Sequence, residues 1–98
     1  MKKVSLLICF FILNIGCALS QKYSVQNAHS HNDYEQARPF ELAYEHGFGS
    51  VEADVFLTNG HLLVAHNIKD TQSSKNLKNL YFDPLLMHIR KNKGSVYP

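Results

Sequence analysis

The chain has 98 residues, of which 45% are hydrophobic, with two cysteines and no tryptophan. Ten Lys and Arg residues nearly balance eight Asp and Glu residues, for a formal net charge of +2. This balance predicts no nucleic-acid-binding surface, which would be clearly basic. A chain of this length buries little of its surface on folding, so we expect it to be part of a larger domain.

The first 20 residues have the pattern of a signal peptide. Lys2 and Lys3 form a basic start, residues 6–15 are apolar, and small residues provide a cleavage site. The apolar stretch is too short to predict a stable membrane span. We therefore expect export to the periplasm or the medium, with lipid anchoring at Cys17 as the less favoured alternative. Processing would leave residues 21–98, which contain no cysteine and have no formal net charge.

The processed part begins with a predicted strand followed by a predicted helix. Residues 23–28 predict the strand, which leads into a histidine-rich loop. Pro39 suits the first position of a helix that runs to about His46, because its missing N–H costs nothing there. Gly47 suits the position after the helix, where a left-handed conformation is needed.

Residues 50–57 predict a second strand that carries two carboxylates on one face. Side chains alternate along a strand, so Glu52 and Asp54 point the same way, and the opposite face is apolar, with Val51, Ala53, Val55 and Leu57. Asn59-Gly60 is a strong signal for a type I′ turn. We therefore expect a hairpin in which residues 61–66 form the returning arm.

The two carboxylates of this strand predict a bound cation. Converging carboxylates repel each other unless a proton or a metal ion lies between them. Histidines stand on both sides in the sequence, with His29 and His31 before the strand and His66 after the hairpin. Imidazole titrates near neutral pH and therefore suits proton transfer.

The remaining sequence completes an α/β pattern. Residues 70–79 are polar and predict a surface loop. Asp83 is expected to cap a second helix, with Pro84 in its first turn and an end near Gly94. A further strand is predicted at the end of the sequence. The order strand, helix, strand, helix, strand is typical of a parallel α/β fold.

Several motifs together resemble the glycerophosphodiester phosphodiesterase family. They are Ala28-His29, Glu52-Ala53-Asp54-Val55, the turn after them, and Val64-Ala65-His66-Asn67. The wider superfamily of phosphatidylinositol-specific phospholipase C-like phosphodiesterases is similar. The chain looks most like a secreted bacterial branch related to the yeast altered-inheritance-of-mitochondria phosphodiesterase-like proteins. The resemblance implies that residues 21–98 are the N-terminal portion of a (β/α)8 TIM barrel, with its site at the carboxyl ends of the strands.

The resemblance also implies a site and an activity. The activity would be hydrolysis of a small-molecule or lipid phosphodiester, such as a glycerophosphodiester, by a metal-dependent enzyme. Glu52 and Asp54 would hold Mg²⁺ or Ca²⁺, which neutralises charge on the phosphodiester. His29 and His66 would be the general acid and base.

Some positions of the site are less determined. His31 and Asn32 are either catalytic residues or neighbours of the site. The family usually has an arginine directly after its first histidine, where it grips the phosphate, and this chain has Ser30. A further metal-binding carboxylate of the family lies on a later strand, beyond Pro98.

Two alternatives stay open. His29-x-His31 also resembles the paired zinc ligands of amidohydrolase-type barrels, an interpretation that leaves Glu52, Asp54 and His66 without a role. The other alternative is a non-catalytic fragment, since residues 21–98 would supply only the first part of the barrel. No oligomeric state is predicted.

Overall fold

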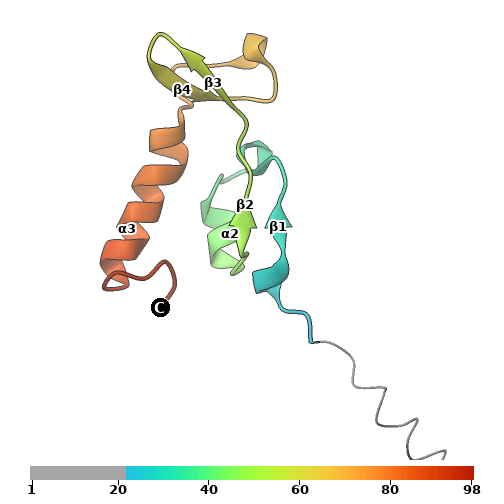
Figure 1. Cartoon of the computed structure of the whole chain (residues 1–98), viewed down its shortest axis with the longest axis vertical. Helices are drawn as coiled ribbons and strands as arrows, with labels where there is room; N and C mark the ends of the chain where they lie inside the picture. Colours follow the sequence, from blue (N-terminus) through green and yellow to red (C-terminus); the bar gives the residue numbers. More distant parts are fainter. Residues whose placement is uncertain (1–21) are drawn as a thin grey trace, which may run out of the picture.

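A computed structural model of the chain describes residues 22–98 (Figure 1). The predicted signal peptide, the first 20 residues, lies outside the described residues. Two short parallel strands begin the fold: β1 (His29–Ser30) pairs with β2 (Ser50–Val51), with His29 opposite Ser50. The helix α2 (Glu41–Glu45) comes between them along the chain. This unit has the strand–helix–strand connection that the sequence predicts.

The segment before β1 is a turn, so the prediction of a strand over residues 23–28 was wrong. A 3-10 helix occupies Val25–Asn27. The N–H groups of Asn27 and Ala28 donate to the carbonyl oxygens of Ser24 and Val25 at 3.0 and 2.9 Å. Backbone groups that would have joined a sheet are therefore used within the segment, and pairing starts only at β1.

The end of α2 confirms the predicted role of Gly47. Its φ angle is +75°, in the left-handed region that glycine adopts without strain. The N–H of Gly47 donates to the Tyr44 carbonyl, and the N–H of Phe48 donates to the Ala43 carbonyl, both at 2.9 Å. These two bonds satisfy carbonyls that the helix end would otherwise leave free, in the pattern of a Schellman motif.

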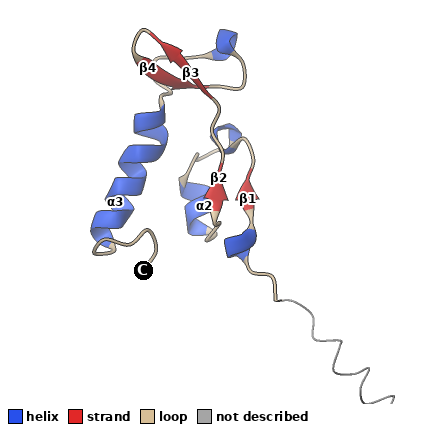
Figure 2. Cartoon of the chain, in the orientation of Figure 1, coloured by secondary structure: helices blue, strands red, loops and turns tan. Residues whose placement is uncertain are grey.

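The predicted strand over residues 50–57 is divided into two. β2 ends at Val51, and β3 (Val55–Thr58) belongs to a separate sheet, with residues 52–54 between them (Figure 2). The N–H of Glu52 donates to the carbonyl of Ser30 in β1, and the N–H of Asp33 in the loop after β1 donates to the carbonyl of Glu52, both at 3.0 Å. Glu52 therefore still contacts β1 and its loop, and regular pairing starts again only at β3.

The second sheet is the hairpin that the turn signal predicted. β3 pairs with β4 (His61–Val64) in antiparallel register, with Thr58 opposite His61. The φ angles of Asn59 and Gly60 are +50° and +80°, as a type I′ turn requires. This prediction is confirmed.

A longer helix follows the loop after the hairpin. Its first turn is a π-helix over Lys78–Phe82, and α3 (Asp83–Lys91) continues from it. Asp83 is therefore inside a helical run and is no N-cap, contrary to the prediction. Its carboxylate instead contacts the Lys78 ammonium at 2.7 and 2.8 Å, one turn earlier. Among residues 22–98, no helix is both long enough and apolar enough to cross a membrane.

A small core connects the hairpin, α2 and the π-helical turn. Phe40, Val64 and Tyr81 are buried together, and the rings of Phe40 and Tyr81 meet edge to face with centroids 6.4 Å apart. Asp33 lies under the same cluster with no exposed surface. It accepts hydrogen bonds from the Ser30 hydroxyl at 2.6 Å, the Phe40 N–H at 2.5 Å and the Tyr81 hydroxyl at 3.0 Å. The Asp33 carboxylate thus connects the histidine loop to Phe40 and to Tyr81, two of the three buried residues of the core.

The apolar row opposite Glu52 and Asp54 is largely uncovered. Val51, Val55 and Leu57 keep 37%, 41% and 74% of their surface exposed. Of the four residues predicted for this face, only Ala53 packs against the core. Within residues 22–98 the other three side chains stay partly exposed, and Leu57 is the most exposed of them.

Candidate functional site

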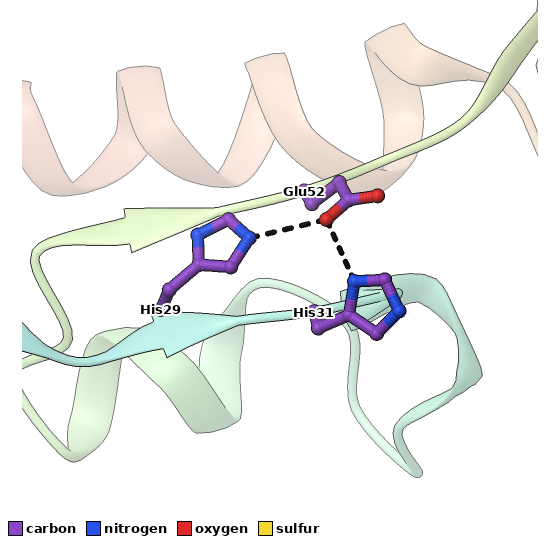
Figure 3. Close-up of side chains that lie close together, drawn as sticks. All are labelled: His29, His31 and Glu52. Atoms are coloured by element: carbon purple, nitrogen blue, oxygen red, sulfur yellow. Dashed lines mark hydrogen bonds and ion pairs between the residues drawn. The ribbon is translucent and has the colours of Figure 1, made fainter.

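The histidine loop and the segment after β2 meet at one carboxylate. Glu52 Oε2 lies 3.1 Å from His29 Nε2 and 2.8 Å from His31 Nδ1 (Figure 3). The other ring nitrogen of His29, Nδ1, lies 2.8 Å from the Ser50 hydroxyl. Both imidazoles therefore face the same oxygen atom.

Strand geometry explains this convergence. Residues two apart on an extended chain point to the same side, as His29 and His31 do. The register of the parallel pair places Ser30 opposite Val51. His31 and Glu52 are the residues that directly follow β1 and β2, so they lie side by side. Both lie where the strands end at their carboxyl side, the edge at which side chains from parallel strands meet.

A second carboxylate has its own histidine. Asp54 Oδ2 accepts a hydrogen bond from the Tyr34 hydroxyl at 2.8 Å and lies 3.3 Å from His66 Nδ1. The Tyr34 hydroxyl is also 3.4 Å from His66 Nδ1. The N–H of Ala65 donates to the Asp54 carbonyl, which holds the start of the His66 loop against the residue that His66 contacts.

These contacts keep both carboxylates ionised. Hydrogen bonds from His31 and then His29 lower the pKa of Glu52, and those from Tyr34 and then His66 lower the pKa of Asp54. The bond to Glu52 raises the pKa of His31. Burial, followed by the bond to Asp54, raises the pKa of Tyr34 to about 12. Tyr34 therefore stays a hydrogen-bond donor at neutral pH.

Three of these residues form a group that could hold a metal ion. One ligand atom from each of His29, His31 and Glu52 lies within 4.8 Å of the other two. Asp54 is outside this group. Two imidazoles and a carboxylate suit a borderline ion such as zinc, whereas Mg²⁺ and Ca²⁺ prefer oxygen ligands alone. This set of ligand atoms fits a divalent cation, and its two imidazoles favour zinc over Mg²⁺ or Ca²⁺.

The sequence interpretation paired the residues differently. It placed Glu52 with Asp54 on one cation and kept His29 for proton transfer. In the structure each carboxylate contacts its own histidine, and His31 shares Glu52 with His29. The interruption of the strand at residues 52–54 separates the two pairs.

Two neighbouring residues also have defined places. Asn32 sits in a left-handed turn with φ of +47°, and its side chain makes no hydrogen bond within residues 22–98. Tyr34, which the sequence did not mark as a site residue, contacts both Asp54 and His66. Its position directly after the histidine loop was the only sequence signal for this role.

The other three histidines lie away from this cluster. His46 and His61 are exposed, one at the end of α2 and the other beside the hairpin turn. His88 Nε2 lies 3.0 Å from Glu41, and its ring stacks on Tyr44 with centroids 3.7 Å apart. His88 is therefore part of the packing between α2 and α3.

Carboxylate–histidine pairs at the ends of neighbouring strands are a chemical arrangement that hydrolases use. Comparison with known families is consistent with that class. The AIM6-like phosphodiesterase domain matches residues 18–96. The chain belongs to this family.

Curated relatives are fungal proteins. The chain is 41% identical over 69 residues to the altered inheritance of mitochondria protein 6 homolog of Arthroderma benhamiae. This match covers 64% of this chain and 22% of that protein. It is 39% identical over 77 residues to altered inheritance of mitochondria protein 6 of Eremothecium gossypii, and 45% identical over 73 residues to that of Kluyveromyces lactis. Those matches cover 70% and 71% of this chain, and 20% and 17% of the two relatives.

The chain thus spans about a fifth of the length of these relatives. No solved structure matches it.

Proposed function

We propose that the chain carries the first part of the active site of a metal-dependent phosphoric diester hydrolase. The observation that carries this proposal is the pair of carboxylate–histidine contacts, Glu52 with His29 and Asp54 with His66, in a member of a phosphodiesterase family. The substrate is a glycerophosphodiester or a phospholipid-like diester.

Asp54 and His66 supply the clearest proton-transfer unit. Asp54 contacts Nδ1 of His66, and Nε2 of His66 makes no hydrogen bond within residues 22–98. A carboxylate that holds one ring nitrogen orients the imidazole and leaves the other nitrogen to exchange a proton with the substrate. Tyr34 supports the same carboxylate from its other side.

His29 needs a rearrangement before it can exchange a proton. Both of its ring nitrogens are engaged, Nδ1 with the Ser50 hydroxyl and Nε2 with Glu52. If Glu52 turns toward a cation, Nε2 of His29 becomes free for the substrate. His29 and His66 then divide the general acid and base roles.

Glu52 and Asp54 are the proposed ligands of Mg²⁺ or Ca²⁺. When bound, such an ion neutralises charge that builds on the phosphodiester. Both carboxylates are ionised and partly exposed, as ligands of a hard cation must be. A further carboxylate from a later strand would complete the site.

One observation favours a second candidate. The His29–His31–Glu52 group brings the two histidines of the amidohydrolase-like alternative together and gives Glu52 a role beside them. In that alternative the ion is zinc and the histidines are ligands. The family match supports the phosphodiesterase instead, so the amidohydrolase-like hydrolase stays second.

We also propose the larger context of the site. A parallel strand pair joined through a helix, and a match that covers only about a fifth of the relatives, support an N-terminal portion of a (β/α)8 barrel of phosphodiesterase type. The proposal includes export of the protein, as in a secreted bacterial branch of the family. Residues 21–98 alone would then be inactive.

The test uses the complete protein that carries this chain, stripped of metal with a chelator. Hydrolysis of glycerophosphocholine should return with Mg²⁺ or Ca²⁺. His66→Ala should lower kcat by about 10²–10⁴-fold, the usual effect of losing a positioned proton-transfer group. His61→Ala, an exposed histidine on the hairpin, is the matched control and should have no effect. Asp54→Asn should lower both the affinity for the cation and turnover.

The alternatives give different results. If only Zn²⁺ restores activity and His31→Ala is more damaging than His66→Ala, the amidohydrolase-like site is correct. If no cation restores hydrolysis in the complete protein, the phosphodiesterase proposal is wrong.

A further inference from the structure

A hollow of about 440 Å³ opens beside His66. Its walls come from two segments, the loop after β1 with Tyr34 and the stretch after β4 with His66 and Lys75. Tyr34 and His66 are the two residues that contact Asp54. The hollow therefore borders the proposed reacting groups directly and offers a space in which a substrate could lie.

Lys75 is the only lysine or arginine among the described residues that line this hollow. Its ammonium makes no hydrogen bond or ion pair within residues 22–98, whereas Lys78 pairs with Asp83 and Arg38 pairs with Glu45. The Lys75 backbone is held in place, because its carbonyl accepts from the Val64 N–H at 2.9 Å. The backbone of Lys75 is thus anchored beside the hollow, and its unpartnered ammonium is available to a ligand.

Two carboxylates line the same hollow. The Glu35 side chain has no hydrogen-bond or ion-pair partner in the described part of the chain, and Asp70 accepts only from the Asn67 amide, at 3.3 Å. No ion pair joins either carboxylate to Lys75 across residues 22–98. The hollow therefore presents one positive charge and two negative charges that do not neutralise one another.

We propose that this hollow binds a phosphodiester whose head group is positively charged. Lys75 contacts the phosphate, and Glu35 contacts the head-group ammonium, with Asp70 adding to the negative potential. An ammonium is a compact charge that binds a phosphate oxygen as a point charge. The proposal deepens the proposed function, on which it rests, because it assigns the phosphate contact and the preferred substrate class to named residues of that same site.

The structure also explains why Ser30 does not make the phosphate contact. Ser30 is buried, and its hydroxyl donates to Asp33 at 2.6 Å. Ser30, the residue directly after His29, is thus buried and bonded to Asp33, and its hydroxyl is not available to a phosphate. A phosphate beside His66 needs a cation from another segment, and Lys75 is the lysine that the hollow offers.

The experiment compares two substrates in the complete protein. Glycerophosphoethanolamine has a cationic head group and glycerophosphoglycerol a neutral one. We expect the wild type to have the lower KM for glycerophosphoethanolamine. Lys75→Gln should raise KM for both by about 10- to 100-fold, the loss of one hydrogen bond to a charged group, with kcat little changed. Lys75→Arg should restore most of the loss.

Glu35→Gln separates the head group from the phosphate. It should raise KM for glycerophosphoethanolamine and leave KM for glycerophosphoglycerol unchanged. Lys69→Gln is the matched control for Lys75→Gln, because it removes the same charge nearby from a residue that does not line the hollow. These variants should fold normally, since Glu35, Lys69 and Lys75 are all exposed.

Calorimetric titration of glycerophosphoethanolamine in the presence of a chelator gives a second measurement that needs no turnover. Binding that weakens in Lys75→Gln and in Glu35→Gln, but not in Lys69→Gln, supports the inference even where hydrolysis fails and the proposed function falls. Hydrolysis by the wild type with KM unchanged in Lys75→Gln overturns the phosphate contact. An equal effect of Glu35→Gln on both substrates overturns the head-group preference.

Discussion

Replacing Asp33 by alanine should destabilise the complete protein by about 3–6 kcal/mol. The buried carboxylate accepts hydrogen bonds from the Ser30 hydroxyl, the Phe40 N–H and the Tyr81 hydroxyl. Without an acceptor, each buried donor costs about 1–3 kcal/mol. A water molecule in the space left by the carboxylate would serve some of these donors, which places the total in the lower part of the summed range.

Asp33→Asn is the matched variant. The Phe40 N–H and the Tyr81 hydroxyl both donate to Oδ2, so the amide oxygen can take that place. The amide nitrogen can then donate to the Ser30 hydroxyl oxygen. We expect a loss of only about 1–2 kcal/mol, because bonds to a charged acceptor become neutral ones.

Urea-induced unfolding, followed by far-UV circular dichroism, measures both variants. A double-mutant cycle of Asp33→Ala with Tyr81→Phe isolates the bond between these two side chains, which come from segments 48 residues apart. A loss below about 1 kcal/mol for Asp33→Ala would refute the argument, since the three donors would then be satisfied without the carboxylate. Equal losses for the two variants would refute it as well.

Three further outcomes are expected. Burial raises the pKa of Tyr81 above its usual 10.0, so the unfolded chain releases a proton first and stability should fall above that pH by about 1.4 kcal/mol per pH unit. Tyr81→Phe should flatten this slope in urea unfolding curves, and an unchanged slope would contradict it. Leu57→Ser should reduce aggregation of residues 21–98 produced alone, measured by light scattering. In the complete protein, where later strands of the proposed barrel would cover this face, the same change should lower stability by about 1.5–3 kcal/mol in thermal melts. A variant that matched the wild type in both measurements would count against the barrel. Gly49→Ala should be much more damaging than Gly47→Ala in the same melts, because its Cβ would overlap the Gln26 carbonyl oxygen, whereas Gly47 has open space and loses only its favoured φ.

Two local signals that depend on glycine or asparagine predicted local structure well. Asn59-Gly60 and Gly47 were assigned from the backbone angles that their positions demand, and the structure confirms both. Such signals work because the residue itself has the required conformational freedom. No distant part of the chain is needed to decide the outcome.

Non-local bonds account for what the sequence did not predict. The strand predicted over residues 50–57 is interrupted at Glu52, whose backbone bonds to Ser30 and Asp33, about twenty positions earlier. An aspartate in a polar loop is usually exposed, whereas Asp33 is buried because it accepts hydrogen bonds from Ser30, Phe40 and Tyr81. No pattern of alternation or turn residues contains this information.

The sequence indicated which histidines and carboxylates belong to the candidate site, but not which histidine contacts which carboxylate. The sequence indicated that histidines and carboxylates from separated segments would lie together, and the structure places His29 with Glu52 and His66 with Asp54. The roles of these residues stay predictions. Pairing depends on which side of an interrupted strand each carboxylate faces, which strand periodicity alone does not give.

The hairpin offers a place for protein engineering. Its base is held by the pairing of Val55 with Val64 and by the bond from Ala65 N–H to the Asp54 carbonyl, whereas its tip at Asn59 and Gly60 is exposed and points away from β1 and β2 (Figure 1). Exposed turns tolerate inserted sequence better than paired strands do. An affinity tag or a fluorescent label inserted at the tip would therefore report on the protein while leaving His66 beside Asp54.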